Sequence, residues 1–494
     1  MQRKTLSTAV LPRLPLPVLA STLKFLCSGE DPRSIDTAQS KCHRRFIKGK
    51  APQLSLTHRF PDLGPNRQGR GTTYTKRRLG MNPRTFACLC VVMTALASRG
   101  ALAAGPITEQ ELGEQLYFDQ TLSLNDNQAC ASCHDPDSGF ADPRNTADPY
   151  NTPVSPGSIG GKFGTRNAPS AAYARFSPSF HWDGDEGLYV GGQFWDGREN
   201  HLAGQASGPP LNPVEMALPD KAAAIDKLRV DQDYVTAFND VFNLDLDDAS
   251  RSPAGVLAAY DRMARAIGEF EKTRRFAEFS SKFDYWLAGE YQMTRQEAKG
   301  FKLFTGKAKC NLCHLSDAQV APDGEHIIPP LFTDFTFDNL GIPANPRIAE
   351  LHGESVPVDY GLGGRADIAA IDPVTLDNDD VVSAGQAGKF KVMSLRNIAA
   401  TPPYGHNGYF ASLQEIVHFY NTRDVLPDCA ALSNPKEREN CWPAPEVPLN
   451  VNEDELGRLN LTADQEAALV AFLETLTDGY GLPPLPPVIL PPSP

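Results

Sequence analysis

Two copies of the pattern Cys-x-x-Cys-His constrain this chain more than any other feature. They read 130-CASCH-134 and 310-CNLCH-314. In this pattern the two thiols reach the two vinyl groups of one haem as thioethers, and the adjacent imidazole lies under the iron. Zinc and a thioredoxin-like disulfide are the alternatives for Cys-x-x-Cys, but both copies carry the terminal His and neither has zinc-ribbon spacing to another pair. The motifs therefore predict two covalently bound c-type haems, with His134 and His314 as proximal ligands.

The segments ahead of the two motifs form a loose internal repeat. They read 111-ELGEQLYFDQTLS-123 and 296-QEAKGFKLFTGKAK-309, and each has apolar residues at helical spacing followed by a short loop. A helix, a loop and a haem motif in this order are typical of a small cytochrome c domain. The sequence predicts a mainly α fold with long loops and two cytochrome c-like haem domains, over residues 105–290 and 291–480.

The rest of the mature chain supports this architecture. Residues 254–275 have the pattern of an amphipathic helix, and 282–290 lead into the second unit. Gly, Pro, Asn and Asp crowd 135–170, 321–346 and 352–380, which predicts long loops rather than strands. Residues 481–494 are a Pro-rich tail without a core of its own.

The N-terminal region carries an export pattern. Basic residues precede an apolar stretch from Phe86 to Ala97, and small residues suited to cleavage end at Ala104, so 81–104 is predicted to be a signal peptide. The stretch is too short for a comfortable membrane span, which takes roughly 20 apolar residues. Residues 1–80 are a doubtful leader, because a signal ought to be N-terminal and Met81 is the expected translation start. A periplasmic protein is the expected product, and an uncleaved anchor is the alternative.

Charge and cysteine usage narrow the functional classes. The 494 residues carry a formal net charge of −13, with no long basic run, which argues against nucleic acid as a partner. Of ten cysteines, four lie before residue 105 and four in the haem motifs. The remaining two, Cys429 and Cys441, lie in a Pro-rich loop and are predicted to form a disulfide in an oxidising compartment.

The segment 193-QFWDGRENHLAGQASGPPLNPVEM-216 is the richest in groups that could line the open face of a haem. Its order of FWDGR, Gln-Ala, Gly-Pro and Asn-Pro-x-Glu-Met is followed by the second haem motif and by 394-SLRNIAATPPYGHNGYF-410. This combination resembles the bacterial di-haem cytochrome c peroxidase and MauG family over residues 111–478. The resemblance implies that peroxide reacts at a low-potential N-terminal haem and that the C-terminal haem relays electrons.

The resemblance also implies roles for individual residues of this pocket. Glu215 matches the distal glutamate, and a carboxylate above the iron can move a proton between the two peroxide oxygens. Gln205, Pro209 and Met216 match other lining positions, and Trp195 matches the residue between the haems. Taken from the residues alone, Glu215 is an exposed helix cap and Trp195 an ordinary core tryptophan.

A calcium site and a histidine follow from the same resemblance. Asn167, Thr401 and Pro403 match positions that supply oxygen ligands to an inter-domain Ca²⁺, and amide and carbonyl oxygens are what this hard cation prefers. His406 matches a histidine whose expected role is to hold a loop or the haem propionates.

The chain departs from the peroxidase pattern in the loop 158-SIGGKFGTRNAP-169, which lacks the histidine that blocks the peroxidatic iron until the second haem is reduced. The N-terminal iron is therefore expected to be open, as in MauG. The stretch 181-HWDGDEGLYVGG-192 is an apparent insertion. Its His181 is an alternative ligand, although a loop histidine there is more often solvated.

The second departure lies in 413-LQEIVHFYNTRD-424. Where peroxidases carry an axial methionine, 17 residues after Pro403, this chain has Tyr420, as MauG-like members do. A tyrosine ligand to the C-terminal iron is implied, and it would favour the ferric state. Met393 is the alternative ligand but lies outside the matching position. His418 points roughly 200° away from Tyr420 on a helix and is expected to be exposed or hydrogen-bonded.

Three functions are consistent with the sequence. The first is a peroxidase that reduces H₂O₂ with electrons from a small cytochrome or copper protein. The second is a MauG-like oxidase acting on side chains of a specific protein substrate. The third is a non-enzymatic di-haem electron carrier, against which Glu215 and an open iron speak. The resemblance also allows a homodimer.

Overall fold

A computed structural model describes residues 106–321, 324–429, 440–481, 485 and 488–489. The predicted leader and signal peptide, and most of the Pro-rich tail, lie outside the described residues. The α-helices are α3 (Glu109–Phe118), α4 (Cys130–Cys133), α5 (Pro143–Ala147), α6 (Leu202–Ala206), α7 (Lys221–Leu228), α8 (Gln232–Phe242), α9 (Leu246–Ala249), α10 (Pro253–Glu271), α11 (Lys282–Leu287), α12 (Arg295–Phe304), α13 (Pro346–His352), α14 (Ala366–Ala369), α15 (Leu413–Thr422) and α16 (Ala463–Leu473). None of the described helices is long and apolar enough to cross a membrane.

Short 3₁₀ helices and strands fill the connections between these helices. The 3₁₀ helices are η2 (Gln120–Leu122), η3 (Pro136–Ser138), η4 (Ala174–Phe176), η5 (Pro209–Leu211), η6 (Arg274–Phe276), η7 (Cys310–Leu312), η8 (Leu362–Gly364), η9 (Ile398–Ala400) and η11 (Glu474–Leu476). The strands are β1 (His181–Asp183), β2 (Leu188–Val190), β3 (Gln319–Val320), β4 (Ile327–Ile328), β5 (Phe337–Asp338), β6 (Pro373–Thr375), β7 (Val381–Ser383) and β8 (Phe390–Lys391). Helices with only short strands between them are consistent with the predicted mainly α character.

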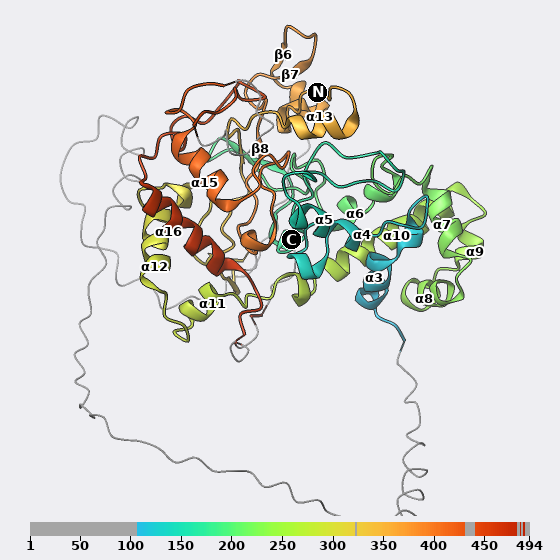
Figure 1. Cartoon of the computed structure of the whole chain (residues 1–494). Coiled ribbons are helices and arrows are strands. Elements are labelled where there is room, and N and C mark those ends of the chain that lie inside the picture. Colours follow the sequence, from blue (N-terminus) through green and yellow to red (C-terminus); the bar gives the residue numbers. More distant parts are fainter. Residues whose placement is uncertain (1–105, 322–323, 430–439, 482–484, 486–487, 490–494) are drawn as a thin grey trace, which may run out of the picture. The chain divides into compact units, whose positions relative to one another are not determined.

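The first half of the internal repeat is built on the helix pair α3 and α10 (Figure 1). Thr108 caps α3 and exchanges hydrogen bonds with Glu111 in a capping box, which satisfies backbone donors at the helix start. Gly113 then lies directly against α10, because a Cβ atom there would be 1.9 Å from the carbonyl oxygen of Ala266. Only glycine allows this close contact.

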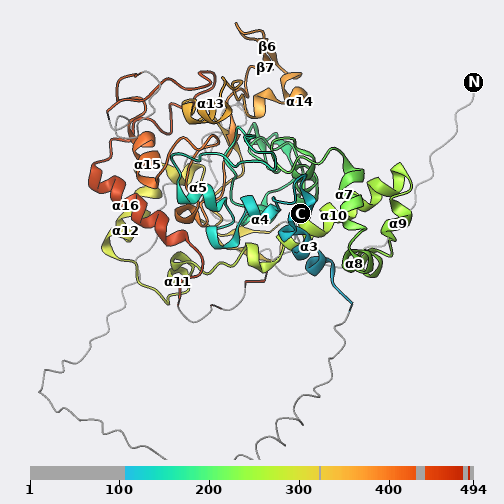
Figure 2. The same cartoon turned by 45° about the vertical axis from the view of Figure 1, so that its right-hand side comes forward.

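The second half repeats the arrangement with α12 and α16 (Figures 1 and 2). Thr294 and Glu297 form the same capping box, and a Cβ atom on Gly300 would lie 1.9 Å from the carbonyl oxygen of Ala468. The two halves therefore share a cap, a contact glycine and an alanine on the partner helix. This shared packing gives the loose repeat of the sequence a physical basis.

Buried apolar residues form two large clusters. The first gathers side chains of α3, α7, α8 and α10, and the second those of α12, α15 and α16. The clusters do not divide the chain at residue 290, because Phe283 belongs to the second and Phe335 to the first. The division into two haem domains stays a prediction.

The sheets are small and antiparallel. They pair β1 with β2, β3 with β4, β5 with β8 and β6 with β7. Figure 2 shows α14 beside the β6–β7 hairpin. The prediction of loops without strands holds for 135–170 but is wrong for 321–346 and 352–380, which contain β4, β5 and β6. These strands have two or three residues, too few for a periodicity to be read.

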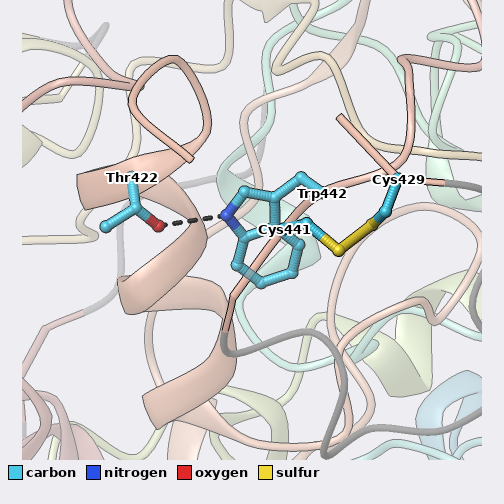
Figure 3. The surroundings of a disulfide bond; sticks show 4 residues. All are labelled: Thr422, Cys429, Cys441 and Trp442. Carbon is cyan, nitrogen blue, oxygen red and sulfur yellow. Dashed lines mark hydrogen bonds between the residues drawn. A yellow bond between two sulfur atoms is a disulfide. The ribbon is translucent and has the colours of Figure 1, made fainter. Parts of the chain in front are cut away.

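The predicted disulfide between Cys429 and Cys441 is confirmed, with Cα atoms 5.6 Å apart (Figure 3). The neighbouring Trp442 is 2% exposed and donates from its indole nitrogen to the hydroxyl of Thr422, 3.0 Å away. This hydrogen bond holds the residue next to the bridge against the end of α15.

A buried ion pair joins distant segments. Arg396, from the SLRN stretch, is 2% exposed and places Nη1 2.6 Å from Asp284 Oδ2 on α11. Its Nε also donates to the carbonyl oxygen of Pro330 at 2.8 Å. Because both charges are removed from water, each depends on the other.

Candidate active site

One cavity of about 790 Å³ is lined by residues of both haem motifs. Every residue for which the sequence predicts a role at the haems or at calcium lines it: Cys130, Cys133, His134, Asn167, Trp195, Gln205, Pro209, Glu215, Met216, Cys310, Cys313, His314, Thr401, Pro403 and Tyr420. The fold therefore collects into one place residues that are almost 300 positions apart in the chain.

The first haem motif presents two free thiols and an oriented imidazole. Cys130 and Cys133 are unpaired on α4. His134 Nδ1 lies 3.2 Å from the carbonyl oxygen of Phe140, while the His134 carbonyl accepts from Tyr117 at 2.8 Å. Burial lowers the pKa of His134, so the imidazole is neutral. A neutral ring whose Nδ1 is bound to a carbonyl offers Nε2 to a metal.

The second motif has the same features. Cys310 and Cys313 are unpaired, and His314 Nδ1 lies 2.8 Å from the carbonyl oxygen of Phe332. Burial lowers the pKa of His314 to about 4. Hydrogen bonds with the backbone of Phe332 and of Met393 oppose this lowering. Thiols, imidazoles and cavity fit two covalent haems.

Glu215 is held in place by its own loop. Asn212 Nδ2 donates to Glu215 Oε1 at 2.7 Å, and the backbone nitrogen of Ser158 donates to the Glu215 carbonyl at 2.6 Å. Burial raises the pKa of Glu215, while the charge of Arg198 and the bond from Asn212 oppose the rise. The same cavity is also lined by Gln205 on α6, Pro209 on η5 and the buried Met216. A carboxyl that changes charge state easily suits proton transfer.

Trp195 is fixed by backbone contacts. Its indole nitrogen donates to the carbonyl oxygen of Asn167 at 2.9 Å, and its own carbonyl accepts from the backbone nitrogen of Lys391 at 2.8 Å. The Lys391 ammonium is buried and donates to the Gly192 carbonyl at 2.5 Å. The segment 192–195 is therefore tied down at both ends.

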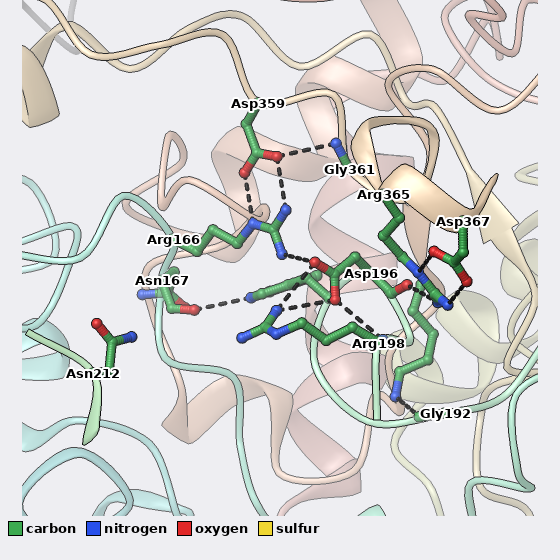
Figure 4. Close-up of polar contacts among 12 residues, drawn as sticks. Arg166, Asn167, Gly192, Asp196, Arg198, Asn212, Asp359, Gly361, Arg365 and Asp367 are labelled. Carbon is green, nitrogen blue, oxygen red and sulfur yellow. Dashed lines mark hydrogen bonds and ion pairs between the residues drawn. The ribbon is translucent and has the colours of Figure 1, made fainter. Parts of the chain in front are cut away.

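A charged cluster surrounds this segment (Figure 4). Arg166 bonds to both oxygens of Asp359, at 2.6 and 2.8 Å, and to Asp196 at 2.7 Å. Arg198 bonds to the same Asp196 carboxylate at 3.0 Å. The cluster holds the Asp-Gly turn after Trp195 against residues more than 160 positions away in the chain.

Tyr420 and His418 lie on different sides of α15. Tyr420 lines the cavity together with Ile416, one helical turn before it. His418 points to α16, where its Nδ1 lies 3.1 Å from Glu466 Oε1. The prediction that His418 is hydrogen-bonded is confirmed.

The two loops that carry the predicted calcium ligands are in contact. The Asn167 side-chain nitrogen donates to the Pro153 carbonyl at 3.0 Å, which directs the amide oxygen elsewhere. The Asn167 backbone nitrogen donates to the carbonyl of His406 at 2.7 Å, so this loop touches the segment of Thr401 and Pro403. The His406 ring stacks on Phe390 with centroids 3.6 Å apart and lies 3.6 Å from Glu446. Whether Ca²⁺ binds stays a prediction.

His181 is placed on the exposed strand β1. Its Nδ1 lies 2.8 Å from the carbonyl oxygen of Ser179, and it does not line the cavity. The loop 158–169 contributes Gly164, Thr165 and Arg166 to the lining instead.

Two buried ionisable groups in the lining were missed from the sequence. Glu271, at the end of α10, is 6% exposed, and its Oε2 has no partner among the described residues. Burial raises the pKa of Glu271 to about 8 and lowers that of Lys391 to about 7. Helix periodicity places Glu271 near the buried face, but nothing local distinguishes it from the half-buried Glu269.

This chain is similar to several known proteins. A family model described as di-haem cytochrome c peroxidase matches residues 108–292. The chain is 40% identical over 399 residues to the methylamine utilization protein MauG of Paracoccus denitrificans, covering 80% of this chain and 95% of that one. It is 32% identical to the cytochrome c peroxidase Ccp of Escherichia coli, covering 62% and 51%. The crystal structure of the diheme peroxidase BthA from Burkholderia thailandensis superposes with a TM-score of 0.58 at 29% identity, covering 75% and 86%.

Proposed function

This chain belongs to the di-haem cytochrome c peroxidase and MauG family, whose members are oxidoreductases, and we propose that it is an exported enzyme that reacts with H₂O₂ at its N-terminal haem. Electrons reach that haem through the C-terminal haem. The observation that carries the proposal is the single cavity shared by both haem motifs, Glu215, Trp195 and Tyr420. A protein that only carries electrons does not need a proton-transferring carboxyl group such as that of Glu215 in this cavity.

Two covalent haems, one in each predicted domain, are the cofactors we propose. Thioethers form at Cys130 and Cys133 and at Cys310 and Cys313, with His134 and His314 as proximal ligands. A haem held here supplies the iron at which peroxide is taken up. The protein contributes neutral, oriented imidazoles and a cavity lined by residues of both haem motifs.

Glu215 is the proposed proton carrier. Its carboxylate takes the proton from the inner peroxide oxygen and returns it to the outer oxygen, which leaves as water. Asn212 keeps one carboxyl oxygen fixed at 2.7 Å, so that the other is free to face the substrate. Gln205, Pro209 and Met216 shape the space around it.

Trp195 is the proposed relay between the two haem sites. The acceptor of its indole N–H is the backbone carbonyl of Asn167, which is not a base. The indole therefore keeps its proton when it transiently gives up an electron. We propose that Ca²⁺, bound by Asn167, Thr401 and Pro403, holds this carbonyl in position.

Tyr420 is the proposed second ligand of the C-terminal iron. Its place on the cavity side of α15 supports this choice. A phenolate ligand stabilises ferric iron, whereas a thioether ligand favours ferrous iron.

A MauG-like reaction on the side chains of a protein substrate is the second candidate. It is favoured by Tyr420, by a loop 158–169 without histidine and by the extensive similarity to MauG. In both cases the partner is a protein, either an electron donor or a substrate. We propose that the enzyme acts in the periplasm. The family resemblance also allows a homodimer.

The decisive experiment adds one equivalent of H₂O₂ to the fully ferric protein and follows the haem absorption spectrum. An immediate change without prior reduction is expected from an open N-terminal iron. A change that persists without a reductant favours the MauG-like reaction, while fast return with a reduced carrier protein favours the peroxidase. No reaction until the protein is half-reduced would mean that the iron is blocked by a ligand such as His181.

A further inference from the structure

The β1–β2 hairpin exposes an aromatic residue that the mechanism above does not use. Trp182 is 51% exposed, whereas Trp442 is 2% exposed and Trp195 lies in the cavity. In the antiparallel register Trp182 is paired with Tyr189, so both side chains lie on the same face of the hairpin. Their ring centroids are 4.8 Å apart.

A row of rings continues from this pair toward Trp195. Tyr189 stacks on Phe180 with centroids 5.2 Å apart and planes within 6°. Phe180 contacts Phe337 edge-on at 5.8 Å. Phe337 is the strand partner of Lys391, whose backbone nitrogen donates to the Trp195 carbonyl.

The turn after Trp195 is shaped to receive these rings. A Cβ atom on Gly197 would lie 2.7 Å from Phe337 and 2.8 Å from Phe180, so only glycine lets both rings pack on this backbone. Arg365 adds a second link, because its guanidinium covers Phe180 at 4.2 Å and donates to the Asp196 carbonyl at 3.0 Å. The row of rings is therefore in van der Waals contact with the segment that carries Trp195.

The surface around Trp182 is acidic. Residues 181–192 contain Asp183, Asp185 and Glu186 and no Lys or Arg. The charges of Asp372 and Asp367 also reach Tyr189, and the charge of Arg365, which is paired with Asp367, partly opposes them. An exposed aromatic ring inside an acidic rim suits a partner with an apolar centre and a basic rim.

We propose that a small one-electron carrier protein with a basic face docks on the β1–β2 hairpin and delivers its electrons through Trp182. This rests on the proposed function, because H₂O₂ is the oxidant. Trp182 gives an electron to Trp195 through Tyr189 and the packed phenylalanine rings, and the carrier restores it. From Trp195 the electron passes by way of the C-terminal haem to the site of H₂O₂, as proposed above. Two reduced carriers lose one electron each, and one H₂O₂ takes up both with two protons to give two water molecules.

The test uses the enzyme with both haems and a strongly basic reduced cytochrome c as the probe. In Trp182→Leu the ratio of cytochrome-driven to ascorbate-driven H₂O₂ turnover should fall roughly tenfold, as for a central interface tryptophan. In Trp182→Tyr, whose side chain can still be oxidised, this ratio should stay close to that of the unaltered enzyme. The double change Asp185→Asn, Glu186→Gln should weaken cytochrome binding about fivefold at low salt, and high salt should remove the difference. The matched control is Asp240→Asn, Glu290→Gln, two exposed acids elsewhere.

Binding is measured separately by calorimetry, and peroxide-treated enzyme is mapped for spin-trap adducts, expected on Trp182. If Trp182→Leu binds and oxidises the cytochrome like the unaltered enzyme, the docking inference is overturned and the proposed function stands. If the unaltered enzyme consumes no H₂O₂ even with ascorbate, the proposed function itself fails.

Discussion

Replacing Glu215 by Gln separates proton transfer from every other property of the pocket. Glutamine keeps the size of the side chain and a carbonyl oxygen that can accept the bond from Asn212, now 2.7 Å from Glu215 Oε1. What it loses is the ability to take up and return a proton. General acid–base catalysis contributes about 10²- to 10⁴-fold, which corresponds to roughly 3–5 kcal/mol of activation free energy. The rate of reaction with H₂O₂ should fall by this factor.

The assay is stopped-flow mixing of the ferric protein with H₂O₂, with the second-order rate constant taken from the haem absorbance. The ionised carboxylate accepts the first proton, so the rate of the unaltered enzyme should rise with pH through the pKa of Glu215, which burial places above its ordinary value. In Glu215→Gln this rise should be absent, while the haem content stays the same.

Asn212→Ala is the control, because it keeps the carboxyl and removes the bond that positions it, together with the 3.2 Å bond from the Val214 nitrogen to Asn212 Oδ1. One such bond contributes about 0.5–1.5 kcal/mol, so the rate should fall no more than about tenfold and keep its pH dependence. If Glu215→Gln reacts within threefold of the unaltered enzyme at all pH values, Glu215 is a structural residue and the reasoning is wrong.

Three further outcomes are expected. Tyr420→Phe should change the ferric spectrum of the C-terminal haem, and an unaltered spectrum would exclude Tyr420 as its ligand. Arg396→Met leaves Asp284 buried without its partner and should lower the free energy of unfolding by about 3–5 kcal/mol, measured by denaturant titration; a loss below about 1 kcal/mol contradicts this. Glu271 has a folded pKa of about 8 against 4.5 ordinarily, so between these values only the unfolded chain has lost the proton and stability falls as pH rises. The slope is on the order of 1 kcal/mol per pH unit, and Glu271→Gln should abolish it in melts from pH 5 to 8.

Local patterns predicted several of the helices and one side-chain orientation. The apolar spacing of 254–275 became α10 (Pro253–Glu271), and the period of α15 already separated Tyr420 from His418. These features depend on residues within one or two turns of each other. The short strands β4, β5 and β6 were missed, because two or three residues pair only when a distant segment lies beside them.

The residues that line the pocket could be predicted from the sequence only in part. Similarity to a family indicated Glu215, Trp195 and Asn167, but no local signal indicated Lys391, Glu271 or the ring contacts of Phe180. Their properties come from neighbours far along the chain, such as the Gly192 carbonyl that Lys391 binds and the turn at Gly197 on which Phe180 packs.

The sequence by itself determined where haem can be attached and which helix faces are apolar, since both follow from residues a few positions apart. Only the tertiary structure decided which carboxyl groups face the cavity, what holds them and which tryptophan reaches the surface. The physical reason is that exclusion of water and contact between rings depend on segments that only the folded chain brings together.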